Sequence, residues 1–491
     1  MSLINVNNLT FGYEGSINNV FENVSFNIDT DWKLGLIGRN GKGKTTFLKL
    51  LLGKYEYKGT ISKNVEFDYF PFEIENKERM AIEVVHEIAP NVEDWEIIKE
   101  LNLLNTNAEI LYRNFNILSG GEQVKILLIS LFLKGNNFLL IDEPTNHLDT
   151  ETKENLVEYL NKKKGFILVS HDRNFLDKVV DHIISINNTN IEIQKGNFTS
   201  WQENKEAQDN FEKTQNEKLI KDINRLEIAS KNTAKWSDKI EKSKYNNKSS
   251  EFVDRGYIGH QSAKMMKKSK VIEKRIEKKV EQKSNLLHNV DRADSLKITP
   301  LETRKNPIIV ADNLQIKYDD KAIFNKISFE IENEDRIAIT GKNGAGKSSL
   351  LKLIMENEIK YEGNLKKVND IKISYVSQST EHLKGTLKEF AQNNKVDESI
   401  FKAMLSKMGF TNLEFETDIS KMSEGQKKKV LIAKSISEPA NIYIWDEPLN
   451  YIDILTRIQI EEAIIKYKPT IIFVEHDETF IKNVATKVIK L

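Results

Sequence analysis

Residues Gly38 to Thr45 read GRNGKGKT, and residues Gly341 to Ser348 read GKNGAGKS. Both stretches fit the phosphate-loop pattern GxxxxGK[ST], whose glycines let backbone N–H groups and the start of a helix surround phosphate oxygens. In each case a short apolar run comes directly before the loop and a helical pattern follows it. A buried strand that leads into such a loop and then into a helix is typical of an α/β nucleotide-binding domain. The sequence therefore predicts two such domains in one chain.

Three further motifs follow each loop at matching distances. The offset between the two copies of a motif is always 303 to 305 residues. Four motifs held in register over that distance indicate tandem duplication of one domain. The pairs are LSGGEQ (118–123) with MSEGQK (422–427), FLLIDEP (138–144) with IYIWDEP (442–448), and SHD (170–172) with EHD (475–477).

Composition excludes several classes of protein. The 491 residues include no cysteine, so neither disulfides nor thiolate metal sites are possible. The N-terminus has no basic and apolar regions of the kind that a signal peptide carries. The longest apolar stretch, near Ile126 to Leu133, is far shorter than the roughly 20 residues that span a bilayer. We expect a soluble, cytoplasmic protein.

The formal net charge of zero hides a basic middle segment. Between Gln202 and Lys305 there are 25 Lys/Arg against 17 Asp/Glu, so the rest of the chain carries a matching acidic excess. The bias is sharpest from Lys231 to Lys283, with 16 basic and 7 acidic residues. A basic segment between acidic flanks suggests that the middle of the chain meets a polyanion.

The same middle segment differs from its flanks in pattern. Apolar residues recur at spacings of three, four and seven from Gln202 to about Tyr245, and again from about Ser262 to Leu296. This predicts two long amphipathic helices in an antiparallel hairpin, with its tip at about 246–261, where glycines and polar residues cluster. We therefore expect a first domain at 1–201, a linker at 202–305 and a second domain at 306–491. A solvated charged spacer is the alternative interpretation of the linker.

The motifs supply the groups that ATP hydrolysis needs. The loop lysines would neutralise phosphate charge, and the hydroxyl that follows each would bind Mg²⁺ together with an aspartate at the end of an apolar strand. The glutamate after each aspartate is placed to polarise the attacking water, and the histidine after the next strand to contact the γ-phosphate. These residues are Lys44, Thr45, Asp142, Glu143 and His171 in the first copy, and Lys347, Ser348, Asp446, Glu447 and His476 in the second.

LSGGEQ together with these loops resembles the ATP-binding cassette superfamily. The resemblance implies a fold of two tandem P-loop NTPase domains, here called the first and second cassette, joined by the long α-helical hairpin linker. It also implies that each nucleotide lies between the phosphate loop of one cassette and the signature motif of the other, with a tyrosine stacked on adenine. The implied ATP-binding residues are Tyr13, Gly38, Asn40, Gly41, Gly43, Lys44, Thr45, Thr46, Ser423, Gly425 and Gln426 at one site, and Tyr318, Gly341, Asn343, Gly344, Gly346, Lys347, Ser348, Ser349, Ser119, Gly120, Gly121 and Gln123 at the other.

Two departures from the family pattern fall in the site formed by the first loop and the second signature. The family places a glutamine after the strand that follows the phosphate loop, where it touches Mg²⁺. The second cassette has Gln378 in YVSQ, whereas the first has Phe72 in YFPF. The second signature has Glu424 where glycine is usual. We expect two unequal sites, both with a catalytic glutamate.

Two cassettes around a linker of roughly one hundred residues resemble the ABC-F proteins, over essentially the full length. Within that family the chain looks most like the Lsa-type antibiotic-resistance branch, on stretches such as DWKLGLIGRNGKGKTT (31–46), YIGHQSAKMMKKSK (257–270) and YIWDEPLNYID (443–453). The resemblance implies a monomer that binds the tRNA exit site of the bacterial 70S ribosome, with 23S rRNA and P-site tRNA as contacts. The expected rRNA-binding residues are Phe252, Arg255 and Tyr257 at the tip and Lys264, Lys267, Lys268, Lys270, Lys274 and Arg275 beside it.

The resemblance implies a function and leaves alternatives. An ATP-gated clamp would fix the linker on the ribosome and protect the peptidyl-transferase centre from lincosamides, streptogramin A or pleuromutilins, with hydrolysis driving release. A housekeeping ABC-F translation factor would share every motif. A transporter ATPase subunit would need a membrane partner, and a DNA-maintenance ATPase would have far longer arms; we expect no membrane subunit.

Overall fold

The computed structural model describes most of the chain outside the distal part of the linker. The described residues are 2–14, 19–135, 137–145, 148, 150–187, 189–246, 264, 267, 271, 274–276, 278, 295–318, 321–342, 344–356 and 359–491. The chain divides into one compact unit, Met1–Trp201 with Ala293–Leu491, and a second unit, Gln202–Arg292. The compact unit contains both cassettes.

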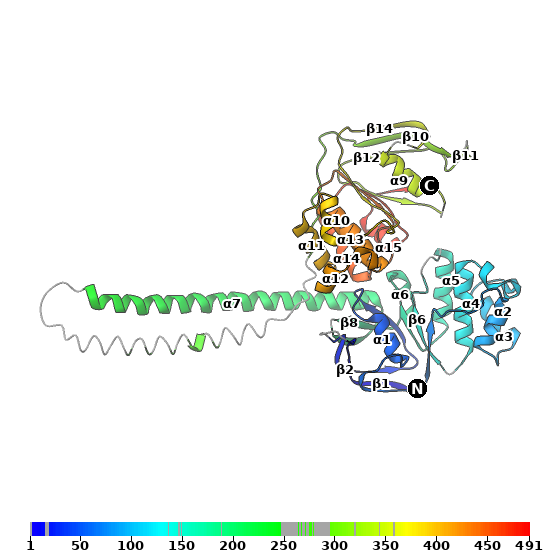
Figure 1. Ribbon diagram of the computed structural model, residues 1–491, viewed down its shortest axis with the longest axis horizontal. Coiled ribbons are helices and arrows are strands. Elements are labelled where there is room, and N and C mark those ends of the chain that lie inside the picture. The colour runs from blue at the N-terminus through cyan, green and yellow to red at the C-terminus, as the bar shows by residue number, and fades with distance from the viewer. Residues whose placement is uncertain are drawn as a thin grey trace. The chain divides into compact units, whose positions relative to one another are not determined.

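A mostly parallel sheet forms the centre of the first cassette (Figure 1). Its strands are apolar on both faces, as in a sheet covered by helices on either side. In the strand order β5-β6-β7-β3-β8-β9 only β9 is antiparallel to its neighbour. The strands are β3 (Lys33–Gly38), β5 (Glu66–Phe70), β6 (Asn137–Asp142), β7 (Phe166–Val169), β8 (His182–Asn187) and β9 (Asn190–Lys195).

The strand order brings the first cassette's motifs to one edge. Strand β3 lies next to β7, and β7 next to β6, all parallel. Their carboxyl ends carry the phosphate loop, His171 and Asp142, respectively. Ligands in such sheets bind beyond the carboxyl ends of the strands. The duplicated motifs therefore converge although they are far apart in sequence.

The second cassette repeats this arrangement. Its parallel sheet has the order β15-β16-β17-β13-β18, with β13 in the place of β3. The strands are β13 (Arg336–Thr340), β15 (Ile373–Val376), β16 (Ile442–Asp446), β17 (Ile471–Val474) and β18 (Lys487–Lys490).

A small antiparallel sheet accompanies each parallel sheet. In the first cassette the order is β2-β1-β4, and in the second β10 pairs with β11, β12 and β14. The strands are β1 (Leu3–Phe11), β2 (Phe21–Asp29), β4 (Lys58–Ser62), β10 (Ile309–Tyr318), β11 (Lys321–Ala322), β12 (Ile327–Ile331) and β14 (Tyr361–Lys367).

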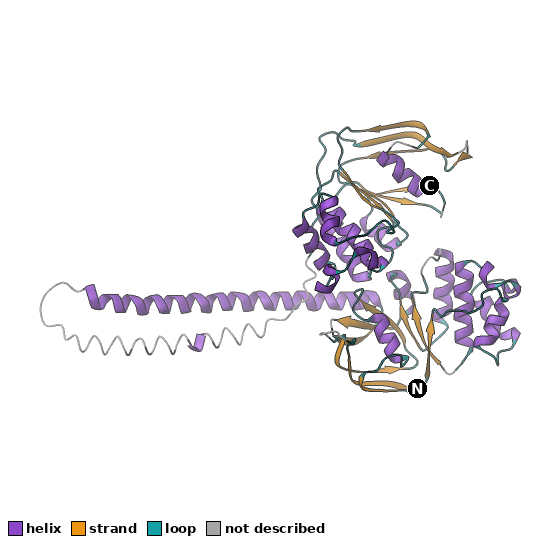
Figure 2. Ribbon diagram, in the orientation of Figure 1, coloured by secondary structure: helices purple, strands orange, loops and turns teal. Residues whose placement is uncertain are grey.

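The two cassettes have similar helices, and α1 in the first and α9 in the second lie among the strands of their cassette (Figure 1 and Figure 2). In the first cassette they are α1 (Lys44–Leu51), α2 (Ala81–Ile88), α3 (Asp94–Leu103), α4 (Gly120–Leu133), α5 (Thr150–Asn161) and α6 (Arg173–Val179), with 3₁₀ turns η1 (Ala108–Tyr112) and η2 (Phe115–Ile117). In the second they are α9 (Lys347–Glu356), α10 (Leu387–Asn393), α11 (Glu398–Lys407), α12 (Asn412–Glu416), α13 (Glu424–Ser437), α14 (Ile454–Tyr467) and α15 (Glu478–Val484), with η3 (Ile419–Lys421).

The linker begins as one long helix, as its pattern predicts. Helix α7 runs without interruption from Phe198 to Asn246, 49 residues. At 1.5 Å per residue this is roughly 70 Å long. Its first turn is anchored in the first cassette, because Phe198 and Trp201 are buried in the hydrophobic core. Of the second predicted helix the structure describes only 264, 267, 271, 274–276 and 278, all of them helical.

The compact unit resumes at Ala293, whereas the sequence pattern placed 293–305 in the linker. Leu296 and Ile298 are buried in the core of the second cassette. Leu301 N donates to Ala440 O at 2.8 Å. Two buried apolar side chains are too few to show a sequence periodicity that would separate this non-helical segment from the end of a linker helix.

No helix among the described residues is long and apolar enough to cross a membrane. The predicted α/β architecture with two similar nucleotide-binding domains is confirmed.

Candidate nucleotide-binding and hydrolysis sites

Each phosphate loop wraps closely around its lysine. Lys44 Nζ donates to Gly38 O at 2.7 Å and to Asn40 Oδ1 at 3.2 Å. Lys347 Nζ donates to Gly341 O at 2.8 Å. Burial lowers the pKa of both lysines. Each ammonium therefore lies inside its loop, where phosphate oxygens would replace carbonyls as its partners.

The last glycine of each loop cannot be replaced by a larger residue. Gly43 has φ +95°, and a Cβ there would lie 2.6 Å from Val20 Cγ1. Its counterpart Gly346 has φ +92°, and a Cβ would lie 2.6 Å from Ile323 Cγ2. Both the backbone conformation and the neighbouring side chain require glycine.

The residues expected to hold Mg²⁺ lie beside these loops. Thr45 Oγ1 is 3.5 Å from Asp142 Oδ2, which also accepts a hydrogen bond from Tyr69 Oη at 2.9 Å. Burial raises the pKa of Asp142 and of Asp446. Asp446 Oδ1 is buried and has no hydrogen-bond partner, so it can accept from a metal-bound water.

The described residues contain no cluster of three His, Cys, Asp or Glu side chains that could hold a metal by themselves. A hydroxyl and one carboxylate per site, completed by phosphate oxygens and water, suit Mg²⁺, which keeps several waters and binds with nucleotide. The donor set therefore fits a nucleotide-bound magnesium ion.

Both predicted catalytic glutamates adopt the left-handed backbone region, which is rare for residues other than glycine. Glu143 has φ 53° and Glu447 has φ 48°. Such conformations cost energy and are concentrated at functional sites. The carboxylates differ in their surroundings. Burial, reinforced by Asp142, raises the pKa of Glu143 to about 7, whereas the nearby imidazole of His476, together with the amides of Gln378 and Asn450, lowers the pKa of Glu447.

The first-cassette glutamate has few partners. Glu143 Oε2 accepts a hydrogen bond from His171 N at 3.3 Å. His171 Nε2 is 3.2 Å from Glu143 Oε1 without the geometry of a hydrogen bond, so Oε1 remains unsatisfied. Burial and the nearby Lys44 hold the pKa of His171 well below its usual value, so the imidazole is neutral and the contact is no ion pair. An unsatisfied carboxylate oxygen beside a phosphate loop is where an attacking water would be held.

The second-cassette glutamate is held from several sides. Glu447 Oε2 accepts from Gln378 Nε2 at 2.9 Å and from Asn450 Nδ2 at 2.8 Å. His476 Nε2 lies 3.7 Å from Glu447 Oε1. The side chain of Phe72, which stands where Gln378 stands in the second cassette, packs instead against the first cassette's hydrophobic core. The two sites are therefore built differently, and the first cassette has no glutamine side chain at this position.

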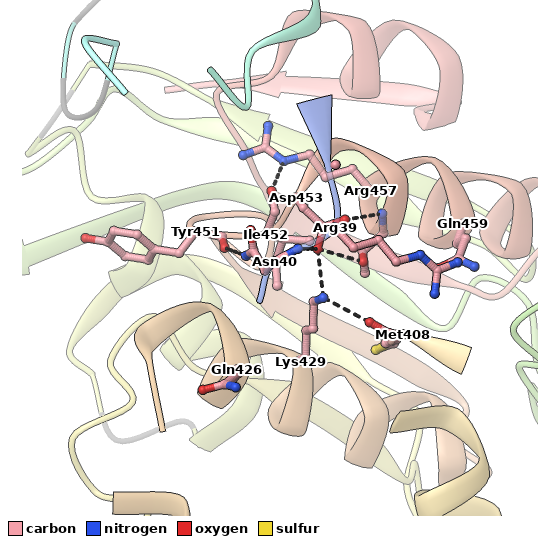
Figure 3. Close-up of polar contacts among 12 residues, drawn as sticks. Arg39, Asn40, Met408, Gln426, Lys429, Tyr451, Ile452, Asp453, Arg457 and Gln459 are labelled. Carbon is pink, nitrogen blue, oxygen red and sulfur yellow. Dashed lines mark hydrogen bonds and ion pairs between the residues drawn. The ribbon is translucent and has the colours of Figure 1, made fainter. Parts of the chain in front are cut away.

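The first phosphate loop touches the second cassette (Figure 3). Asn40 N donates to Asp453 Oδ2 at 3.2 Å, and Asn40 Nδ2 donates to Tyr451 O at 2.9 Å. A Cβ on Gly425 of the second signature would lie 2.9 Å from Asn40 Nδ2 and 2.5 Å from Tyr451 O. The structure thus brings the first loop to the second signature, the pairing that the family resemblance implies.

Asp453 joins three elements at this contact. Its carboxylate accepts from Lys429 Nζ at 2.7 Å, and Oδ1 accepts from Thr456 N at 2.9 Å at the start of α14. The side chains of Asp453 and Lys429 are 0% and 4% exposed. Despite burial, the charges of Lys429 and Lys44 hold the pKa of Asp453 far below its usual range. Asp453 and Lys429 were not among the predicted site residues, although Asp453 ends the NYID stretch that parallels NHLD in the first cassette.

A second contact between the cassettes is a buried ion pair. Arg173, two residues after His171, lies 2.7 Å from Glu461 Oε2 on α14. Their side chains are 7% and 11% exposed. The equivalent positions in the duplicated copies are Glu478 and Val157, which cannot form such a pair. This contact between the cassettes is therefore not repeated by the duplication.

The signature helices begin in the same way. The Ser119 side chain accepts a hydrogen bond from Glu122 N, and the Glu122 side chain accepts one from Ser119 N, so the two residues form a capping box at the start of α4. Ser423 and Gln426 form the same capping box at the start of α13. The counterpart of Gln426 is therefore Glu122 and not Gln123, which stands one position later. Gln123 Nε2 donates to Phe115 O at 3.1 Å and Leu118 O at 3.0 Å, within its own cassette.

The remaining predicted residues are placed as follows. Tyr13 is 46% exposed, and its hydroxyl lies 2.6 Å from Thr46 Oγ1 at the start of α1, so its ring is available beside the loop. Ser119 and Gly120 are exposed at the start of α4, and Gly121, the next residue, is half-buried.

Asn343 and the side chain of Tyr318 lie outside the described residues, as do Phe252, Arg255, Tyr257, Lys268 and Lys270. Gly41, Gly344, Ser348 and Ser349 occupy the loops and helix starts expected of them.

Glu475, which precedes His476, makes the protein's stability depend on pH. It is 5% exposed, and its oxygens accept from Leu449 N at 2.7 Å and His476 N at 3.1 Å. Burial raises its pKa to about 7 from 4.5. A pKa that is higher in the folded state gives stability that is complete below pH 4.5 and is lost as the pH rises through about 7.

We expect Glu475→Gln to gain stability relative to wild type, by on the order of 3 kcal/mol, as the pH rises from about 5 to 8. Thermal unfolding of both proteins at the two pH values measures this, because titrations shared by both proteins cancel in the difference. Ser170, the counterpart of Glu475, supplies a control: Ser170→Ala should show a difference that does not change with pH. A pH-independent gap for Glu475→Gln would contradict the assignment.

Comparison with known proteins agrees with this geometry. The model of the ABC transporter family matches residues 21–146 and 324–450. The protein Uup of Buchnera aphidicola is 31% identical over 99% of this chain and 80% of its own length. The ribosome protection protein VmlR of Bacillus subtilis is 28% identical over 96% of this chain and 84% of its own.

Further relatives, in Arabidopsis thaliana, carry the name ABC transporter F family member. Among solved structures, an archaeal ribosome recycling factor in complex with a ribosomal stalk protein matches with a TM-score of 0.61 at 18% identity, covering 98% of this chain and 87% of that one, which supports the fold. ABC ATPase domains bind ATP with Mg²⁺ and hydrolyse it. With two such domains on one chain and relatives named as F family members, this protein belongs to the ABC transporter family, as an ABC-F ATP-binding protein.

Proposed function

We propose that this chain binds the bacterial 70S ribosome in its ATP-bound form, acts in the cytoplasm as a monomer, and protects the peptidyl-transferase centre from antibiotics. The observation that carries the proposal is the basic linker, residues 202–305 and here called the arm, between two ATPase cassettes, in a chain that resembles the ribosome protection protein VmlR over nearly its whole length. The drug classes expected from the Lsa-type resemblance are lincosamides, streptogramin A and pleuromutilins.

The described part of the second linker helix presents a cationic stripe. Lys264, Lys267, Lys274, Arg275 and Lys278 are helical and exposed. At 3.6 residues per turn their positions fall within a sector on the order of 100° wide, which also contains exposed Val271, whereas half-buried Ile276 lies outside it. Cations on one face suit the phosphates of an rRNA helix, whose backbone is reached without reading the sequence.

The cassettes would act as an ATP-gated clamp. Two nucleotides, each with Mg²⁺, would close the phosphate loops on the opposite signatures and fix the arm in its ribosome-binding pose. Glu143 and Glu447 would each hold the attacking water, with Lys44 and Lys347 neutralising phosphate charge. Hydrolysis would then remove the γ-phosphate that both cassettes hold and let the chain leave the tRNA exit site.

Ribosome pelleting over a range of salt concentrations tests the arm. Replacing Lys264, Lys267, Lys274 and Arg275 together by glutamine should flatten the slope of log affinity against log salt by on the order of 3, because each lost phosphate contact contributes about 0.7 to 0.9. The matched control replaces four exposed lysines of the cassettes, Lys54, Lys99, Lys162 and Lys384. Equal slopes for the two variants would contradict an rRNA-binding stripe.

A further inference from the structure

Helix α13 lies between the two predicted ATP sites. Its N-terminus carries the second signature, which meets Asn40 of the first phosphate loop through Gly425. One turn further on, Lys428 is 2% exposed. Its ammonium donates to Ser377 O at 2.9 Å and to Glu447 O at 3.0 Å. The signature helix of one site is thus hydrogen-bonded to the catalytic segment of the other.

Glu424 makes a second link from the same helix. Its carboxylate accepts a hydrogen bond from the hydroxyl of Thr380, which is 3% exposed, and pairs with Lys427 at 3.0 Å. Thr380 lies two residues after Gln378, whose amide donates to Glu447 Oε2 at 2.9 Å. Lys428 and Glu424 therefore hold the segment 377–380 from both sides of Gln378.

Breaking these hydrogen bonds would cost free energy. A buried ammonium that loses carbonyl acceptors pays a desolvation penalty, so its acceptors must move with it. Burial already lowers the pKa of Lys428, while the carboxylates of Glu475, Asp446 and Glu447 favour its charge. A shift of α13 would consequently displace Ser377 and the backbone of Glu447.

The first cassette has the same elements without these links. Strands β5 and β15 end 306 residues apart, at Phe70 and Val376, and α2 and α10 begin 306 residues apart, at Ala81 and Leu387. The segments between strand and helix in the two cassettes therefore align without a gap. The helices α4 and α13 begin 304 residues apart. Where the second cassette has Gln378, Thr380, Glu424 and Lys428, the first has Phe72, Ile74, Gly120 and Val124, none of which has a polar side chain.

We infer that Lys428, supported by Glu424, is a positioning residue that couples the two sites in one direction. Nucleotide held between the first phosphate loop and the second signature sets the position of α13, and through it the placement of Gln378 and Glu447 at the second phosphate loop. The first cassette, with apolar side chains at these positions, returns no equivalent signal. The inference rests on the proposed assignment of the two composite sites and not on ribosome binding.

The coupling is measured as a ratio of ATP turnover numbers. In a Glu143→Gln chain the first loop can bind but not turn over ATP, and in a Lys44→Ala chain it cannot hold ATP, so both report hydrolysis at Glu447. The ratio of their rates gives the effect of first-site occupancy on the second site. We expect about fivefold or more, the usual lower range for coupled sites. The mirror ratio, Glu447→Gln over Lys347→Ala, reports the opposite direction.

Adding Lys428→Met, or separately Thr380→Val, should reduce the first ratio toward 1 and leave the mirror ratio unchanged. Two substitutions on different elements guard against a folding defect in either one. The control is Lys421→Met, which alters an exposed lysine three residues before α13 and should retain both ratios. A first ratio that survives Lys428→Met and Thr380→Val, or two ratios that fall together, would overturn the inference. If the four parent variants all kept wild-type turnover, the site assignment itself would fail.

Discussion

Asp453→Asn should lower the free energy of unfolding by about 3–5 kcal/mol, because it leaves the buried ammonium of Lys429 without its counter-charge. The two side chains are 2.7 Å apart and almost completely buried. Asparagine is itself a good N-cap, so the start of α14 should survive and the loss can be assigned to the charge. Chemical denaturation measures the change.

The double variant Asp453→Asn with Lys429→Met separates charge from packing. Removing both partners of a buried pair leaves no uncompensated charge, so the double variant should recover much of the loss. Glu398→Gln is the exposed control: its pair with Lys402 is also 2.7 Å long, but the side chains are 35% and 44% exposed, and the expected effect is within about 0.5 kcal/mol. A loss for Asp453→Asn no larger than that of the control would refute the role of this pair.

Replacing Glu143 and Glu447 together by glutamine should reduce ATP turnover by about 10²- to 10⁴-fold, the usual contribution of a general base. The amide keeps the size of the side chain but cannot take a proton from water. ATP binding should persist, because Lys44, Lys347 and the loop amides are unchanged, so nucleotide affinity measured by filter binding separates binding from chemistry. Under the proposed clamp, the same variant should remain on ribosomes in the presence of ATP.

The control for this variant is Glu151→Gln, an exposed glutamate in the first turn of α5. It should turn over ATP at the wild-type rate and leave ribosomes normally. A double variant whose turnover stays within a few-fold of wild type would show that neither glutamate is the base.

The near-constant spacing between the paired motifs made much of the fold predictable from the sequence. Four pairs of motifs at a near-constant offset indicate a duplicated α/β domain, and the parallel strands bring each set to one edge. Contacts between residues that are far apart in the sequence could not be predicted in the same way. Lys428 and Lys429 look like surface residues in the run KKK, and only the packing of α13 against other elements makes both of them buried.

The departures from the family pattern were visible in the sequence, but their consequences were not. Glu424 and Phe72 stand out as unusual residues, yet the bond to Thr380 and the core packing of Phe72 depend on neighbours that no local pattern specifies. The family resemblance implies Gln123 and Gln426 as ATP contacts, but the two residues do not occupy equivalent positions. The reciprocal cap of Ser119 with Glu122 shows the correct alignment.

Drug susceptibility tests the proposed function most directly. A sensitive Gram-positive host should be compared when it expresses the wild-type chain, the Glu143→Gln/Glu447→Gln variant, or the arm variant at Lys264, Lys267, Lys274 and Arg275. The proposal predicts raised inhibitory concentrations for lincosamides and pleuromutilins with the wild-type chain alone. Unchanged susceptibility with a wild-type chain that still pellets with ribosomes would contradict antibiotic protection, and would favour a housekeeping ABC-F translation factor.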